Sequence, residues 1–214
     1  MKFLKIIAYP VLAILIILTG MEFIPALKVF FTHLAIYKWL LIGVAVFIVC
    51  CFIPPLNKNI DWARVFTHEL CHTVAGILMY HRIIDFQAGT KGGVMYHSGR
   101  FGSTFITMAP YTMLLYTFPC LLFRVMGQNA FIYIIDMLIG FTLAFHISCF
   151  WDQTGFHQTD IKNTGYVKAI MYIAVWHMFN GSLIILSIRK GIWGAFGYLF
   201  TNYWQDLLKL IPGV

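Results

Sequence analysis

Charged residues are scarce in this chain. Asp, Glu, Lys and Arg make up only 11% of its 214 residues, and the only two glutamates are Glu22 and Glu69. Hydrophobic residues reach 60%, and the mean hydropathy is +0.80. A water-soluble domain of this size does not need so much apolar surface. The composition therefore excludes an ordinary soluble domain and predicts a polytopic membrane protein.

The chain also lacks the patterns of several other classes of protein. It has no run of basic residues, so the net charge of +7 predicts contacts of scattered Lys and Arg with anionic lipid head groups and no nucleic-acid binding. The five cysteines show no CxxC spacing, which argues against a thiolate zinc site and a disulfide framework. We find no internal repeat, low-complexity tract or linker, and therefore expect a single domain over residues 1–214.

Long apolar runs are abundant, and a membrane-spanning helix needs about 20 such residues. Five such runs are present, and one further helix is expected after Pro54-Pro55, with Asp61 as its N-cap. This further helix is largely apolar but also carries polar residues. We thus predict an all-α fold with about six membrane helices, the first of them uncleaved, and a C-terminal segment (192–214) at the membrane interface. The six helices are expected near residues 5–25, 33–53, 62–80, 105–126, 129–150 and 168–188.

Two β-prone runs follow the third of these helices. They are residues 83–87 and 94–97, and the turn between them contains Gly92-Gly93. This pattern predicts a short β-hairpin, and an ordinary polar connector is the alternative.

The strongest motif is His68-Glu69-Leu70-Cys71-His72, an HExxH sequence within an apolar helix. Residues four positions apart lie on one helix face, so both imidazoles can bind one metal ion. The carboxylate that follows His68 then suits a general base beside a metal-bound water. The alternative is a pair of packing histidines with a stray carboxylate, but an unpaired carboxylate in such apolar surroundings is costly.

A catalytic zinc ion usually has three protein ligands and one open position. The extended motif HExxHxxGxxH is excluded by Ala75 and Leu78, and no glutamate follows Glu69. Asp152 and Asp160 lie in the densest polar cluster (151–160), and from position alone either one could be a ligand or a solvated helix cap. The remaining candidates for the third ligand are His97, Asp136, His146, Asp152, His157, Asp160 and His177.

With these features the chain resembles the site-2 protease family of intramembrane zinc metallopeptidases, over about residues 60 to 175. The resemblance rests on the HExxH motif followed by Gly76, on the Gly92-Gly93 pair, on Met108-Ala109-Pro110 at the start of the next helix, and on a late Asp near a helix start. The family's usual Asn-Pro stretch leading into Leu-Asp-Gly is absent. Gln158-Thr159-Asp160-Ile161 stands in the comparable place, so the chain resembles a divergent branch.

The resemblance implies one Zn²⁺ per chain, held by His68, His72 and Asp160, with Asp152 as the alternative third ligand and Glu69 as the general base. It implies cleavage of peptide bonds in or near transmembrane segments of other membrane proteins, by a multi-pass protein of the cell membrane. The hairpin with Gly92 and Gly93 is expected to hold the unwound substrate. Asn180 is a candidate contact of the substrate or of a zinc ligand, and the favoured alternative for this residue is a simple hydrogen bond between helices.

Two other functions compete with proteolysis. One is a transporter or ion pathway lined by buried polar residues, and the other is a pseudo-peptidase that acts as a binding partner. We find no inverted repeats, which would support a transporter. The HExxH motif has lost no catalytic residue, which argues against a pseudo-peptidase. The residues that would line the pathway are Asp136, His146, His177 and Asn180.

Overall fold

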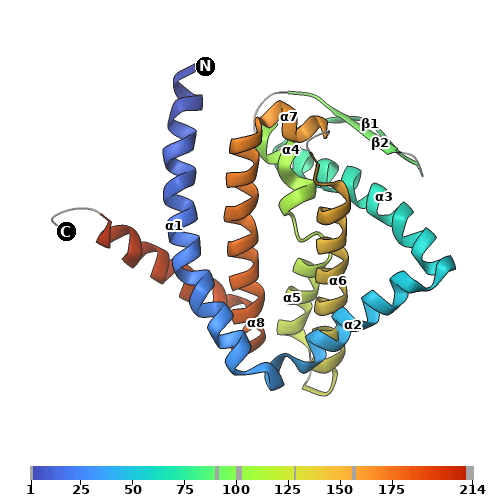
Figure 1. The fold of residues 1–214 in the computed structure, drawn as a ribbon, viewed down its shortest axis with the longest axis vertical. Coiled ribbons are helices and arrows are strands. Elements are labelled where there is room, and N and C mark those ends of the chain that lie inside the picture. The colour runs from blue at the N-terminus through green and yellow to red at the C-terminus, as the bar shows by residue number, and fades with distance from the viewer. Residues whose placement is uncertain (1, 90–91, 100–102, 128, 156–157, 211–214) are drawn as a thin grey trace.

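The computed structural model describes residues 2–89, 92–99, 103–127, 129–155 and 158–210. Helices dominate this part of the chain, and one antiparallel hairpin interrupts them (Figure 1). In chain order the elements are α1 (Lys2–Thr32), η1 (Leu34–Tyr37), α2 (Lys38–Phe52), α3 (Pro54–Leu78), β1 (Ile83–Gly89), β2 (Gly92–His97), α4 (Ser103–Thr112), α5 (Thr117–Met126), η2 (Asn129–Phe131), α6 (Ile132–Gln153), α7 (Thr159–Thr164) and α8 (Tyr166–Lys209).

Four helices of the described residues are long and apolar enough to cross a membrane, and they lie in α1, η1 with α2, α6 and α8. The broken pair α4–α5, bent by 71°, raises the number to five if it counts as one span. The expected count of six is therefore not confirmed. Helix α3 is not among the candidates, and its 25 residues include four charged side chains: Lys58, Asp61, Arg64 and Glu69.

Helix α3 begins earlier than expected. It starts at Pro54, with the two prolines in its first turn, where a missing backbone N–H costs no helical hydrogen bond. The prediction of Asp61 as N-cap is therefore wrong. Asp61 lies inside the helix, is exposed, and pairs with Arg64 at 2.8 Å.

The α4–α5 pair contains a break in an otherwise apolar segment. Pro110 lies near the end of α4, whereas we expected Met108-Ala109-Pro110 at the start of a helix. A break leaves backbone groups without helical partners, and here the amide of Asn180 in α8 donates to the carbonyl oxygen of Thr112 at 2.8 Å. Beyond the break, Arg124 of α5 pairs with buried Asp136 of α6, with Nε and Oδ1 2.6 Å apart. These polar contacts fix the broken pair against its neighbours.

Helix α8 joins two segments that we predicted separately, 168–188 and 192–214. Its backbone bends at Gly191, which has φ +72° and ψ +162°, values that favour glycine. In Figure 1 the part after the bend crosses α1. The Asn202 amide donates to the carboxylate of Glu22 in α1 at 3.0 Å, and residues 211–214 of the predicted interface segment lie outside the described residues.

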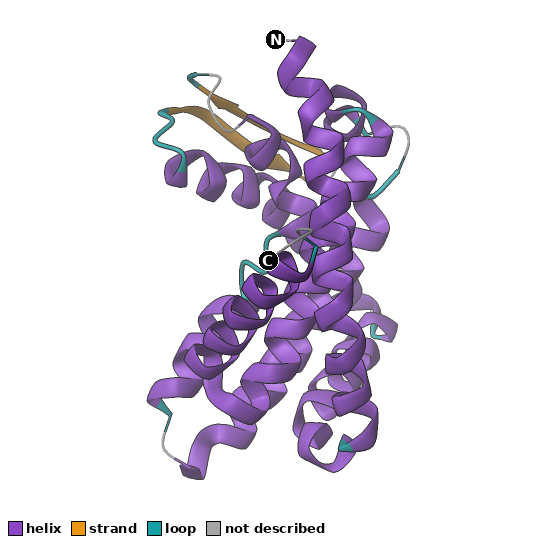
Figure 2. Cartoon of the chain, turned by 90° about the vertical axis from the view of Figure 1, so that its left-hand side faces the viewer, coloured by secondary structure: helices purple, strands orange, loops and turns teal. Residues whose placement is uncertain are grey.

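The predicted hairpin is present. Strands β1 and β2 pair from Ile83↔His97 to Gly89↔Gly92, with an irregularity between Ile83 and Asp85. Figure 2 shows the two strands beside the helices at one end of the molecule, and Figure 1 places α3, α7 and the start of α8 at the same end. This grouping positions the site described next.

Candidate metal centre

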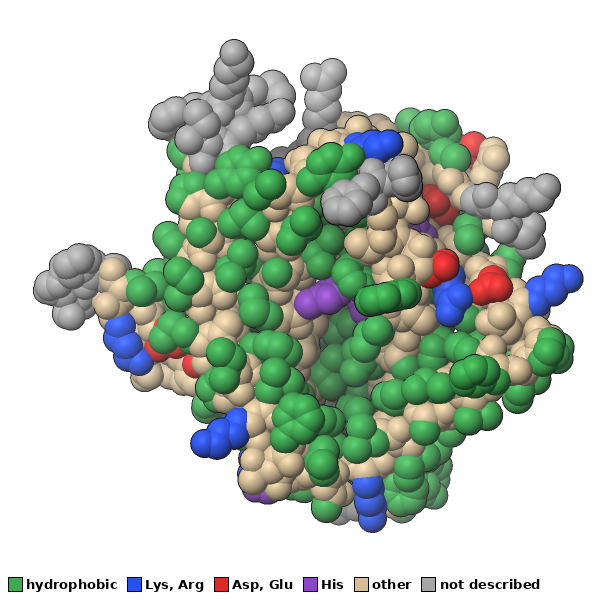
Figure 3. Space-filling model, in the orientation of Figure 1, with side chains coloured by type: hydrophobic (Ala, Val, Ile, Leu, Met, Phe, Trp, Pro, Cys, Tyr) green, Lys and Arg blue, Asp and Glu red, His purple; other side chains and the backbone are tan. Residues whose placement is uncertain are grey.

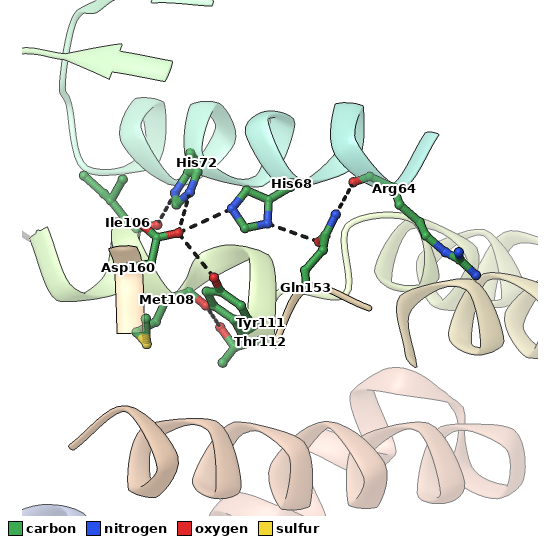
Figure 4. A network of polar contacts seen from close by, with 9 residues as sticks. All are labelled: Arg64, His68, His72, Ile106, Met108, Tyr111, Thr112, Gln153 and Asp160. Carbon is green, nitrogen blue, oxygen red and sulfur yellow. Dashed lines mark hydrogen bonds and ion pairs between the residues drawn. The ribbon is translucent and has the colours of Figure 1, made fainter. Parts of the chain in front are cut away.

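Three potential metal ligands converge where α3 meets α7. His68 and His72 project from α3, and each Nε2 atom lies 3.3 Å from the same oxygen, Oδ2 of Asp160 in α7 (Figure 4). Suitable ligand atoms of the three residues all lie within 4.8 Å of one another. Bonds of about 2.0–2.2 Å around a tetrahedral zinc ion place ligand atoms roughly 3.3–3.5 Å apart. The two distances to Oδ2 match this spacing, and two imidazoles with one carboxylate leave one position of such an ion open.

A backbone carbonyl orients the second histidine. Nδ1 of His72 lies 2.8 Å from the carbonyl oxygen of Ile106 in α4. Since a carbonyl only accepts, Nδ1 of His72 carries a hydrogen, and Nε2 faces Asp160. Nε2 donates to that carboxylate while the ring is protonated, and it presents a lone pair to a metal ion once the ring is neutral. The Ile106 carbonyl has no helical partner four residues later, because that residue is Pro110, which has no N–H. Pro110 thus leaves an acceptor available to His72.

A side-chain amide orients the first histidine. Nε2 of Gln153, the last residue of α6, donates to the backbone oxygen of Arg64 at 2.9 Å. Its Oε1 atom therefore faces Nδ1 of His68, at 3.1 Å, and accepts the hydrogen of that ring (Figure 4). Both histidines consequently present Nε2 to the same point.

Asp160 is held as a carboxylate. Burial raises its pKa, but hydrogen bonds from His68 and His72 and the charges of the two rings lower it by more, so the pKa lies below its ordinary value. The hydroxyl of Tyr111, from α4, also lies 3.4 Å from Oδ2. An ionised oxygen that faces two imidazoles is a suitable ligand for a divalent cation.

Glu69 lies beside the centre and under the hairpin. Only 7% of its surface is exposed. A Cβ added to Gly93 of β2 would collide with Cγ of Glu69 and lie 2.9 Å from its Cδ. The hairpin therefore covers this carboxylate at a position where a side chain has no room. The expected contact of Gly92 and Gly93 with the substrate or a zinc ligand stays a prediction. Gly92 pairs with Gly89 at the end of the ladder.

The other candidate ligands lie elsewhere. Asp152 is exposed and does not belong to the cluster found among the described residues. Asp136 pairs with Arg124, and His97 contacts His81 at the base of the hairpin. His157 lies outside the described residues.

His146, His177 and Asn180 line a separate apolar cavity of about 380 Å³. Asn180 bonds to Thr112, as described above. The rings of His146 and His177 lie 6.0 Å apart. Figure 3 shows histidine atoms beside a hollow in the middle of a largely apolar face. These residues form no cluster with the three potential ligands within the described structure.

Sequence reasoning missed three residues that support the centre: Gln153, Tyr111 and Ile106. Gln153 lies in the polar cluster 151–160 but belongs to no motif, and Tyr111 carries no local signal beyond being polar in an apolar chain. Ile106 contributes its backbone, and the only sequence signal for it is a proline four residues later.

No family model matches the chain, and neither a curated protein nor a solved structure matches it.

Proposed function

We propose that the protein is a zinc-dependent peptidase that cleaves membrane proteins at or near the end of a transmembrane segment. The observation that carries the proposal is the convergence of His68, His72 and Asp160 beside Glu69. Each imidazole has an acceptor behind it, as zinc ligands in proteins usually do. Packing histidines alone do not explain a shared carboxylate oxygen between the two Nε2 atoms.

The position of the centre supports a membrane-protein substrate. Gln153 ends α6, and Asp160 lies just before α8, so the centre lies at the ends of two candidate spans. A peptide bond that reaches it comes from a segment at a similar depth. Because a transmembrane helix hides its carbonyls in internal hydrogen bonds, the substrate must unwind before cleavage. The free edges of the hairpin offer backbone groups that can pair with the unwound chain.

The residues divide the chemical work. His68, His72 and Asp160 would hold the ion, which when bound acts as a Lewis acid and lowers the pKa of water toward neutrality. Glu69 would accept a proton from the attacking water and pass it to the leaving amine. Its burial beneath Gly93 keeps bulk water away from this carboxylate. Localisation of the protein in the cell membrane is part of the same proposal.

The first test measures zinc per chain in protein purified in detergent without a polyhistidine tag. We expect about one zinc at this centre in the wild type, its loss in His72→Ala and Asp160→Asn, and its retention in Asp152→Asn, the matched control. Glu69→Gln should keep its zinc. Its rate of hydrolysis of fluorescently labelled casein should fall by about 100-fold or more, which is the usual effect of removing a general base. A folded wild type that binds no zinc at this centre would exclude the proposal. Unchanged hydrolysis in Glu69→Gln would show that Glu69 is not the general base.

A further inference from the structure

A second pair of histidines lies at the base of the hairpin, outside the centre described above. His81 precedes β1 and His97 ends β2, and their Nδ1 atoms are 2.7 Å apart. The two ring centroids are separated by 4.7 Å at an interplanar angle of 42°. The backbone oxygen of Ser98 lies 3.2 Å from Nδ1 of His97. Two imidazole nitrogens and one carbonyl oxygen therefore converge on a small volume.

The surrounding backbone holds this arrangement in place. The N–H of His81 donates to the carbonyl oxygen of Gly76 at the end of α3, at 2.9 Å. Arg82 and Ser98 close the ladder through two bonds, with Ser98 N 2.9 Å from Arg82 O and Arg82 N 3.1 Å from Ser98 Oγ. Gly99 has φ +90°, and a Cβ there would lie 3.3 Å from the ring of His81. The first ring is therefore packed, with 9% of His81 exposed, whereas His97 is half-buried and reachable.

We propose that His81 and His97 form a second binding site for a divalent transition-metal ion, zinc above all, with the Ser98 carbonyl and water completing its coordination. Imidazole nitrogens suit Zn²⁺, Ni²⁺ and Cu²⁺, and both rings present the same atom, Nδ1. One hydrogen between the two Nδ1 atoms satisfies both of them, so a metal ion would replace this bond. With the hydrogens of both neutral rings on Nε2, the ion accepts the lone pairs of both Nδ1 atoms and of the carbonyl. For zinc the two nitrogens must separate from 2.7 Å to about 3.3 Å, which is a small rotation of the reachable ring.

A metal ion at this site would cross-link the two ends of the hairpin. It would tie His81, three residues after the end of α3, to the last residue of β2, the strand that covers Glu69 through Gly93. Binding does not depend on the function proposed above. Only the consequence for Glu69 rests on that function.

The test uses the full chain in detergent, without a polyhistidine tag, stripped with a chelator and then dialysed against Zn²⁺. We expect about two zinc ions per chain in the wild type and about one in each of His72→Ala and His97→Ala. His33→Ala, which removes an exposed histidine at the end of α1, is the matched control and should keep two. Zinc should also slow hydrogen exchange in residues 83–97 about tenfold in the His72→Ala protein, and this effect should disappear when His97→Ala is added.

The outcomes separate the two proposals. One zinc that survives His72→Ala and is lost in His97→Ala would support the hairpin site and contradict the catalytic centre. A single zinc ion that is lost in His72→Ala and kept in His97→Ala would overturn the hairpin site and leave the catalytic centre supported. Because His81 is buried and its replacement can disturb folding, the reachable His97 carries the test, and an unchanged elution volume shows that the variant is folded.

Discussion

At the scale of single residues, the centre depends on two acceptors that differ in kind. Gln153 contributes a side-chain amide whose orientation is set by Arg64, and Ile106 contributes a backbone carbonyl that Pro110 leaves without a helical donor. Each acceptor fixes the hydrogen of one imidazole on Nδ1. The ligand atoms are therefore oriented before any ion arrives, which lowers the cost of binding.

Replacement of Gln153 tests this orientation. Gln153→Leu keeps the side-chain size but removes the acceptor for His68, so we expect zinc affinity to fall about 10- to 100-fold. Competition with a chelator of known affinity measures the change. Gln205→Leu, at an exposed position of α8, is the matched control and should bind zinc like the wild type. Equal affinity in both variants would mean that the contact between Gln153 and His68 does not orient the ring.

At the scale of elements, two close approaches decide how the helices and the hairpin are placed. Helices α2 and α6 cross with their backbones in contact at Gly43 and Gly140. A Cβ on Gly43 would collide with the carbonyl group of Met137, and one on Gly140 with that of Leu40. The hairpin approaches α3 at Gly93, where a Cβ would collide with the side chain of Glu69. Glycine thus lets two helix backbones meet at the crossing, and it leaves room for the Glu69 side chain under the hairpin.

The hairpin contact predicts a loss of activity without a loss of metal. Gly93→Ala adds a methyl group against the side chain of Glu69 and displaces its carboxylate, and a shift of about 1 Å can cost about 100-fold in rate. We expect hydrolysis of labelled casein to fall about 10- to 100-fold while zinc content stays unchanged. Gly197→Ala, where a Cβ meets no atom within 4 Å, is the control. Full activity in Gly93→Ala would argue against any role of the hairpin in placing Glu69.

The helix crossing predicts a loss of stability. Gly140→Ala forces α2 and α6 apart, because the obstacle is the backbone of residue 40 and not the end of a flexible side chain. We expect a destabilisation of about 2–3 kcal/mol, the usual cost of overpacking, seen as a lower Tm in detergent. Gly197→Ala again serves as the control. A Tm equal to that of the wild type would show that the two helices do not meet at this point.

At the scale of the whole molecule, the outer surface is apolar along the candidate spans. Large side chains point outward, among them Ile24 (69% exposed), Phe31 (66%) and Phe52 (81%). Figure 3 shows apolar side chains over most of the visible face. Water-soluble monomers rarely expose apolar patches of this extent, whereas lipid tails satisfy them. The surface is thus suited to a bilayer, and the metal centre lies toward one end of the bundle.

This surface predicts how the protein partitions. We expect it to remain with the membrane pellet after extraction with alkaline carbonate, since several spans of about 20 residues resist such treatment. Immunoblotting of pellet and supernatant measures the distribution, with a peripheral membrane protein as the control that is released. Recovery of the chain in the supernatant would contradict a polytopic arrangement.

The sequence by itself determined the features that depend on near neighbours. HExxH on a helix, the apolar spans and the hairpin around Gly92-Gly93 all follow from composition and from periods of 3.6 or 2 residues. It did not determine that α3 starts at Pro54 and so includes Lys58 and Asp61. Nor did it determine that α4 and α5 are separate helices joined by a break, because neighbouring elements supply the bonds that stabilise a break. Position alone left Asp152 and Asp160 equivalent. Only the tertiary structure brought Asp160 to His68 and His72 and left Asp152 exposed, because the meeting of ligands far apart in the chain depends on how helices pack.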